Sequence, residues 1–249
     1  MLFRSSLAHW HFAPTTQAQE NLKREHIAAQ HIYPVGNTIV DAVNWAQRHL
    51  QETELSSSAN LKPLLQWVEE HAEHKLVLVT AHRRESWQGD IASISHAIHD
   101  AALRFRDLHF VWPVHPNPVV KKAVHETLQG LDDGLAKRIY LTNPISYPAL
   151  IWLLQRAWLV LTDSGGIQEE AMTLNVPVLI LRNKTERPEV VSAHGGLLIG
   201  TQRENIVNCI QAMHDDPDYH ASFKCKTNPF GDGQSARRIT DILTQHLLN

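Results

Sequence analysis

The chain has 249 residues, 43% of them hydrophobic and 20% charged, and its 23 basic and 26 acidic residues give a formal charge of −3 at pH 7. This composition excludes a disordered or collagen-like chain, and the basic residues form no cluster of the kind that binds nucleic acid. Two cysteines, Cys209 and Cys225, make no disulfide framework, and no apolar run reaches the ~18 residues that cross a bilayer. We therefore expect a cytoplasmic protein without a nucleic-acid or membrane partner.

The first 58 residues predict the end of one α/β domain. Residues 9–13 and 31–35 have the apolar content of strands, and Thr15 or Thr16 can cap a helix between them. Two parallel strands and one helix bury too little surface to fold alone. We interpret this segment as the remnant of a domain that begins before Met1.

A connecting helix over residues 37–51 follows, and the serine-rich residues 55–60 are the best candidate for a linker. From residue 59 to residue 249, short apolar runs alternate with helical periodicity, which predicts an α/β fold with a doubly wound parallel sheet. The expected strands are 76–80, 109–113, 138–142, 158–162, 176–181 and 196–200. The expected helices are 91–106, 118–129, 147–155, 167–174 and 204–214, with a last helix over 233–249.

A phosphate site is predicted where the strand 158–162 turns into the next helix. Gly165 and Gly166 allow close backbone approach, the start of the helix offers N–H groups and a positive dipole end, and the Ser164 hydroxyl adds a donor. Glu170 comes less than two helical turns later, where its carboxylate can accept both hydroxyls of a ribose. Phosphate and ribose together indicate a nucleotide. An ordinary turn, with cap residues and two glutamates in the first helical turn, remains the alternative.

A second polar loop, with the sequence AHRRES, follows the strand 76–80. Carboxyl ends of parallel strands meet at the crevice where open α/β folds bind ligands, so we expect His82 and Arg83 or Arg84 to lie near Ser164. A guanidinium suits a diphosphate, and an imidazole can transfer protons near neutral pH. The alternative is a solvated loop in which Arg84 pairs with Glu85.

Two more loops end predicted strands. The run PVHPNP presents His115 from a turn stiffened by prolines, and a rigid connection without a ligand is an equal alternative. The run TERPE places Arg187 at the rim of the crevice, and Pro188 suits the first position of a helix. A capped polar loop is the alternative there.

The sequence gives little support for a metal or cofactor site. It lacks the GxGxxG, GxxxxGK[ST] and HExxH patterns, and NPFGDG is interpreted as a structural turn. His71 and His74 stand beside three glutamates, but with 17 histidines in the chain we interpret this as chance adjacency. No metal and no cofactor are expected.

The motifs TDSGGIQEEA, AHRRES, PVHPNP, TERPE and NPFGDG, preceded by FAPT and VGNTIVDAV, resemble in this order the non-hydrolysing UDP-N-acetylglucosamine 2-epimerases over nearly the whole chain. The resemblance implies two Rossmann-like domains of the GT-B type, with residues 59–249 as the C-terminal UDP-binding domain and residues 1–58 as the remnant of the N-terminal one. It also implies interconversion of UDP-N-acetylglucosamine and UDP-N-acetylmannosamine, by elimination of UDP across C1–C2 and its return.

The resemblance also implies roles for single residues. It places the diphosphate on Ser164, Gly165 and Gly166, the ribose on Glu170, and His82 and Arg187 among the catalytic groups. It assigns Arg83 and His115 to a second, regulatory UDP-N-acetylglucosamine. UDP and its N-acetylglucosamine conjugate are thus the expected ligands.

This chain differs from the family pattern in several places, and the differences limit which family properties we expect of it. The family's acid and base carboxylates lie in the N-terminal domain, so we expect no turnover by this chain alone, and either a homodimer or a partner that supplies that domain. Ser86-Trp87 and Asn183-Lys184 also differ from the usual residues. The alternatives are an inactive UDP-sugar-binding module, a truncated pseudoenzyme or, less favoured, a GT-B glycosyltransferase.

Overall fold

The computed structural model describes residues 7–50, 55, 59–83, 89–128, 132–225 and 227–247. The chain forms two compact units, one made of Met1–Arg48 with Thr227–Asn249 and the other of His49–Lys226. The predicted linker over 55–60 and the predicted helix ends at residues 51 and 129 fall partly or wholly outside the described residues.

The first unit contains a parallel pair of short strands, β1 (His11–Ala13) and β2 (Ile32–Pro34), as the sequence predicts. Helix α2 (Thr16–Arg24) connects them and is capped by the Thr15 side chain, which accepts a hydrogen bond from Ala18 N at 3.1 Å. A 3-10 turn, η1 (Ala29–His31), precedes β2, and α3 (Thr38–His49) follows it.

The last helix, α14 (Ser235–Leu247), belongs to this first unit, whereas the sequence assigns it to the domain over 59–249. Asp41, in the first turn of α3, accepts hydrogen bonds from the backbone N–H groups of Ser235 and Ala236 at 3.2 and 3.0 Å. The Asn37 N–H donates to Phe230 O at 2.8 Å. These bonds join residues almost 200 positions apart, which local sequence patterns do not reveal.

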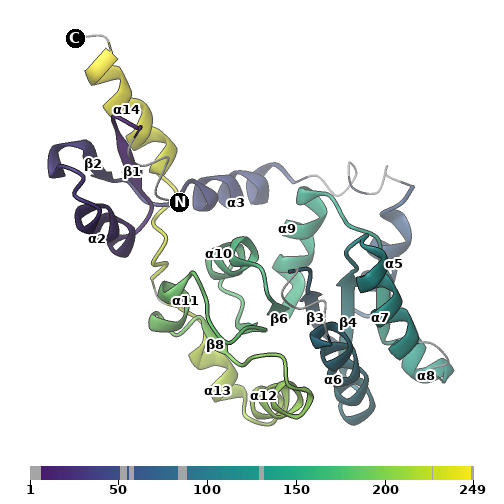
Figure 1. The fold of residues 1–249 in the computed structure, drawn as a ribbon. Coiled ribbons are helices and arrows are strands. Elements are labelled where there is room, and N and C mark those ends of the chain that lie inside the picture. The colour runs from purple at the N-terminus through teal and green to yellow at the C-terminus, as the bar shows by residue number, and fades with distance from the viewer. Residues whose placement is uncertain are drawn as a thin grey trace. The chain divides into compact units, whose positions relative to one another are not determined.

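The second unit is built on one parallel sheet with the strand order β5-β4-β3-β6-β7-β8 (Figure 1). All six expected strands are present, at β3 (Lys75–Thr80), β4 (Leu108–Pro113), β5 (Ile139–Thr142), β6 (Ala157–Thr162), β7 (Val178–Ile180) and β8 (Gly196–Leu198). In chain order this is the 3-2-1-4-5-6 arrangement of doubly wound sheets. The predicted α/β fold class is confirmed.

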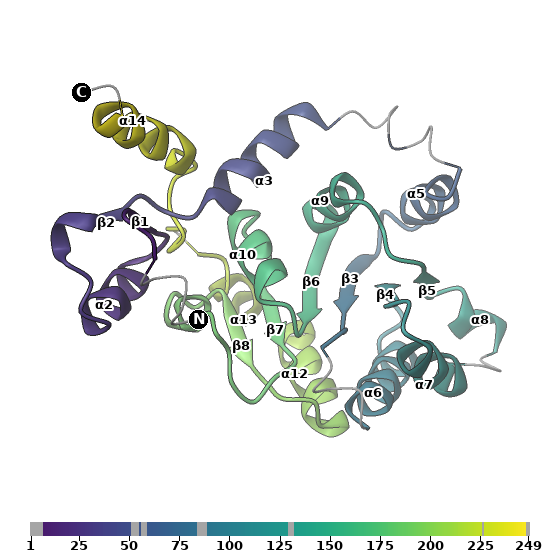
Figure 2. The same cartoon turned by 45° about the horizontal axis from the view of Figure 1, so that its top comes forward.

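Helices cover both faces of this sheet (Figure 2). On one face α6 (Asp90–Arg104) packs between α7 (Pro118–Leu128) and α12 (Arg203–Asp215), and on the other lie α9 (Tyr147–Arg156) and α10 (Gly165–Thr173). Strands buried on both faces carry continuous apolar runs, and Val77, Leu78 and Val79 of β3 are fully buried.

Short helices account for most of the differences from the predicted elements. Pro188 begins α11 (Pro188–Ser192) as predicted. Helices α5 (Lys62–Glu70), α8 (Asp133–Ala136) and α13 (Pro217–Ser222) were not among the predicted elements. Two of them have fewer than seven residues, which is too short for a clear helical periodicity.

A stack of aromatic rings lies at the amino-terminal edge of the sheet. The His109 ring is parallel to that of His74, with 4.2 Å between centroids and 16° between planes, and the His71 ring is 4.5 Å away. His109 is only 3% exposed, and burial, together with its histidine neighbours, lowers its pKa to about 4. The His109 ring stacks on that of His74 and is tilted against that of His71, which is not the arrangement of converging metal ligands.

We expect this stack to make the chain sensitive to acid. Because the pKa of His109 is lower in the folded state, the unfolded state binds the extra proton, and stability falls as the pH drops from about 6.5 to about 4. His109→Phe keeps a ring in place and should remove about 2 kcal/mol of the stability difference between pH 8 and pH 5. Urea unfolding of both proteins at the two pH values measures this. An unchanged difference would contradict the assignment to His109.

Candidate functional site

The candidate site lies where β3 and β6 run side by side and their loops turn in opposite directions, toward β4 and toward β7. This is the topological switch point, at which ligands bind in open α/β sheets. The last residues of the two strands, Thr80 and Thr162, are in register, and the Thr80 hydroxyl donates to the Thr162 hydroxyl at 2.6 Å. The ends of both loops are therefore fixed to each other.

The glycine pair forms the first turn of α10, so the helix begins two residues earlier than the sequence predicts. Ser164 is the N-cap, and its hydroxyl accepts from Ile167 N at 3.5 Å, while its own N–H donates to Thr162 Oγ1 at 2.9 Å. A methyl group placed on Gly165 would first meet the Arg187 side chain at 3.8 Å. The start of α10 thus has the N–H groups and the positive dipole end of a helix N-terminus, which suit an anion.

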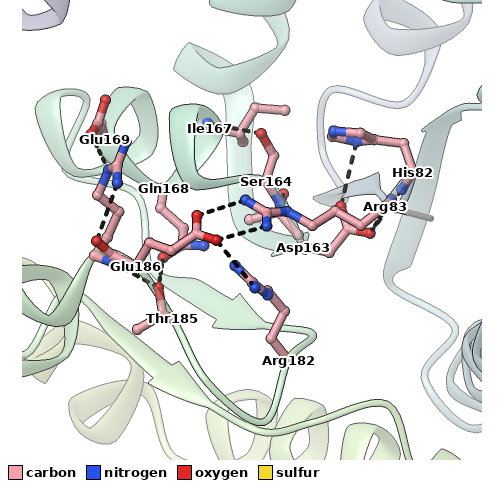
Figure 3. A network of polar contacts seen from close by, with 12 residues as sticks. His82, Arg83, Asp163, Ser164, Ile167, Gln168, Glu169, Arg182, Thr185 and Glu186 are labelled. Atoms are coloured by element: carbon pink, nitrogen blue, oxygen red, sulfur yellow. Dashed lines mark hydrogen bonds and ion pairs between the residues drawn. The ribbon is translucent and has the colours of Figure 1, made fainter. Parts of the chain in front are cut away.

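The loop after β3 is tied to this turn through Asp163 (Figure 3). One oxygen of its buried carboxylate, Oδ2, accepts the backbone N–H groups of His82 and Arg83, both at 2.8 Å. The expectation that these two residues lie near Ser164 is met by the structure. Arg84 and Glu85, the other members of that prediction, lie outside the described residues.

Two carboxylates hold the arginines of the site (Figure 3). The Glu186 carboxylate accepts hydrogen bonds from both terminal nitrogens of Arg83, at 2.9 and 2.8 Å. This hydrogen bonding is the main reason that the pKa of Glu186 falls to about 2. Arg187 donates to Glu169 on α10. In the structure, therefore, both guanidinium groups that the sequence analysis singles out are bound by carboxylates.

Glu170 lies on α10 beneath the glycine turn and is 6% exposed. Burial, and next the charge of Glu169, raise its pKa to about 7, although a hydrogen bond with Tyr147 acts in the opposite direction. Burial, and next the charge of Glu170, raise the pKa of Tyr147 to about 12. Neither glutamate is in the first turn of α10, so the alternative in which both merely stabilise that turn is wrong.

His115, after β4, faces the same edge of the sheet. Its ring is nearly parallel to that of His82, with 6.2 Å between centroids and 15° between planes. Its Nδ1 accepts the backbone N–H of Asn117 at 3.2 Å. The edge therefore brings together most of the residues singled out from sequence: His82, Arg83, His115, Ser164, Gly165, Gly166 and Arg187, with Glu170 buried below them.

Several residues of the site were missed by sequence reasoning. The bonds from Asp163 to the loop after β3 were not foreseen. Gln168, fully buried, accepts from the Thr185 hydroxyl at 2.9 Å and so ties α10 to the loop after β7. Glu169 and Tyr147 were not foreseen as partners of Arg187 and Glu170. These partners come from other elements, and no sequence spacing signals them.

Neither a metal site nor a membrane span is found in the described part of the chain. There, no three His, Cys, Asp or Glu side chains are grouped so that they could hold a metal ion. No helix described is both long enough and apolar enough to cross a membrane.

Strand order, helix start and polar loops together define a doubly wound α/β domain whose candidate site lies at its switch point. The family model for UDP-N-acetylglucosamine 2-epimerase matches residues 3–244. The chain belongs to this family, and the predicted resemblance is confirmed.

Relatives of known name and structure agree with this membership. The UDP-N-acetylglucosamine 2-epimerase of Escherichia coli K12 is 38% identical over 98% of this chain and 62% of its own length. The enzyme from Neisseria meningitidis, solved with UDP-GlcNAc, has a TM-score of 0.83 at 33% identity, and S. aureus MnaA, solved with UDP, has 0.86 at 32%. The alignments cover 97% and 98% of this chain and 62% of each neighbour.

This chain thus spans less than two thirds of the length of these relatives. Its α/β fold is that of GT-B-like epimerases, and the family match favours an epimerase over the glycosyltransferase considered from sequence.

Proposed function

We propose that the chain supplies the nucleotide-binding part of a UDP-N-acetylglucosamine 2-epimerase, which interconverts UDP-N-acetylglucosamine and UDP-N-acetylmannosamine. The observation that carries this proposal is the start of α10, where two glycines without side chains follow the Ser164 cap beside Arg187. Such a helix end suits a diphosphate. Two relatives solved with UDP-GlcNAc or UDP give further support.

Each site residue has a role in this proposal. Ser164, Gly165 and Gly166 hold the diphosphate, and Glu170 accepts hydrogen bonds from the ribose hydroxyls. His82 and Arg187 act at the phosphates and the sugar, where UDP is eliminated across C1–C2 and returned. Arg83 and His115 contact a second, regulatory nucleotide sugar. The closeness of these groups at one sheet edge supports the assignment.

Assembly and compartment form part of the same proposal. The parallel pair β1–β2 has only three residues in each strand, and a sheet of this size is marginal in isolation. This favours a homodimer or a partner that completes the first unit. Both cysteines are free, which fits a reducing cytoplasm.

Calorimetric titration with UDP and with uridine tests the site. Most of the proposed contacts address phosphate oxygens, and a hydrogen bond to a charged group contributes about 1.5–3 kcal/mol. UDP should therefore bind at least about tenfold more tightly than uridine. Equal affinities would refute the phosphate site.

Incubation with UDP-N-acetylglucosamine in deuterated water tests the reaction itself. Elimination and return of UDP exchange the proton at C2 with solvent, so NMR detects deuterium at C2 only if this chemistry takes place. The measurement is made on the chain alone and with the N-terminal domain of a relative added. UDP binding without exchange in either sample would favour a binding module over an epimerase.

A further inference from the structure

The two oxygens of the Asp163 carboxylate have different surroundings. Oδ2 accepts the backbone N–H groups of His82 and Arg83, and the Asp163 N–H donates to Thr80 O at 3.2 Å. The other oxygen, Oδ1, lies 3.4 Å from Nδ1 of the His82 ring. The carboxylate is fully buried, whereas the His82 side chain is 41% exposed. A single buried charge therefore contacts both the backbone and the ring of the same histidine.

Oδ1 is buried and, among the described residues, accepts no hydrogen bond. A buried carboxylate oxygen without a donor is unfavourable by at least about 1–3 kcal/mol. The His82 ring can relieve this if its Nδ1, 3.4 Å from Oδ1, carries the proton. Bonds of this kind are often long in unliganded sites and shorten when substrate binds.

The neighbouring imidazole has the opposite arrangement. Nδ1 of His115 accepts a hydrogen bond from Asn117 N, so neutral His115 carries its own proton on Nε2. His82 and His115 are nearly parallel and lie at the same edge of the sheet, yet their Nδ1 atoms face an acceptor and a donor, respectively.

We infer that Asp163 is a positioning residue for His82. Its Oδ2 fixes the backbone of the loop after β3, and its Oδ1 holds the neutral imidazole in the tautomer protonated on Nδ1. In this tautomer Nε2 carries the lone pair and can accept a proton. This inference rests on the proposed function only for the identity of the molecule that meets Nε2, the nucleotide sugar.

A purely structural role for Asp163 makes a different prediction, and Asp163→Asn separates the two. The asparagine amide oxygen can still accept the His82 and Arg83 N–H groups, so the loop is retained. Its NH₂ group would stand in place of Oδ1 and donate to Nδ1 of His82, which forces the ring proton onto Nε2. A structural role alone leaves the tautomer unchanged.

The tautomer is read by long-range ¹H–¹⁵N NMR of the full chain, labelled on histidine, at about pH 8, where ordinary imidazoles are neutral. His82→Gln identifies the His82 signals. We expect Nδ1–H as the major His82 tautomer in the wild type and Nε2–H in Asp163→Asn. His115 serves as the internal control and keeps Nε2–H in both proteins.

Two outcomes would overturn the inference: Nε2–H at His82 in the wild type, or the same tautomer in both proteins. The first does not depend on whether Asp163→Asn folds. Because the spectra are recorded without ligand, failure to bind UDP in calorimetry would count against the proposed function and leave the tautomer result intact.

Discussion

Gly165→Ala is expected to weaken UDP binding about 100-fold while the chain remains folded, because two charge-assisted hydrogen bonds of about 1.5 kcal/mol each would be lost. The new methyl group would lie at an ordinary 3.8 Å from the Arg187 side chain, so the fold can accommodate it. A ligand phosphate cannot come as close to the N–H groups of the first turn, however, once a side chain stands there.

Thermal unfolding and calorimetry separate these two effects. Alanine favours a helix more than glycine does, so the melting temperature of Gly165→Ala should not fall. Uridine provides the matched control, since it lacks the phosphates and should bind both proteins equally. Unchanged affinity for UDP would place the diphosphate elsewhere in the crevice.

The sheet could be predicted from sequence because its strands are buried on both faces. Runs such as LVLV in β3 and LVL in β6 are apolar without alternation, and polar or glycine-containing loops mark their ends. The position of α14 could not be predicted in this way. It depends on the Asp41 carboxylate, which accepts N–H groups of a segment close to the other end of the chain.

In the candidate site, too, features built from consecutive residues could be predicted, whereas contacts between distant parts of the chain could not. Ser164 and the two glycines were identifiable because their roles depend on a strand, a turn and a helix that are consecutive in sequence. The links from Asp163 to His82 and from Glu169 to Arg187 join different βα units. A single sequence contains the residues for such links but no signal that pairs them.

Glu170→Gln is expected to stabilise the folded chain at high pH. Burial raises the pKa of Glu170 from 4.5 to about 7, so between these values the folded state holds a proton that the unfolded state has released. The free energy of unfolding therefore falls as the pH rises through this range, and above pH 7 the ionised group is unfavourable by about 3 kcal/mol. Glutamine is never ionised and should avoid this loss.

Urea unfolding at about pH 5 and about pH 8 measures the Glu170 effect, with stability gained at the higher pH only. Glu126→Gln, on the surface of α7 beside Lys122, is the matched control and should change stability by less than about 0.5 kcal/mol at either pH.

The same Glu170→Gln protein should bind UDP more weakly, because a neutral amide accepts the ribose hydroxyls less strongly than a carboxylate. A site that sacrifices stability for binding would show both changes together. Equal stability of wild type and Glu170→Gln at about pH 8 would mean that the ionised Glu170 carboxylate does not destabilise the fold. Its assignment to the ribose site would then lose the argument from burial.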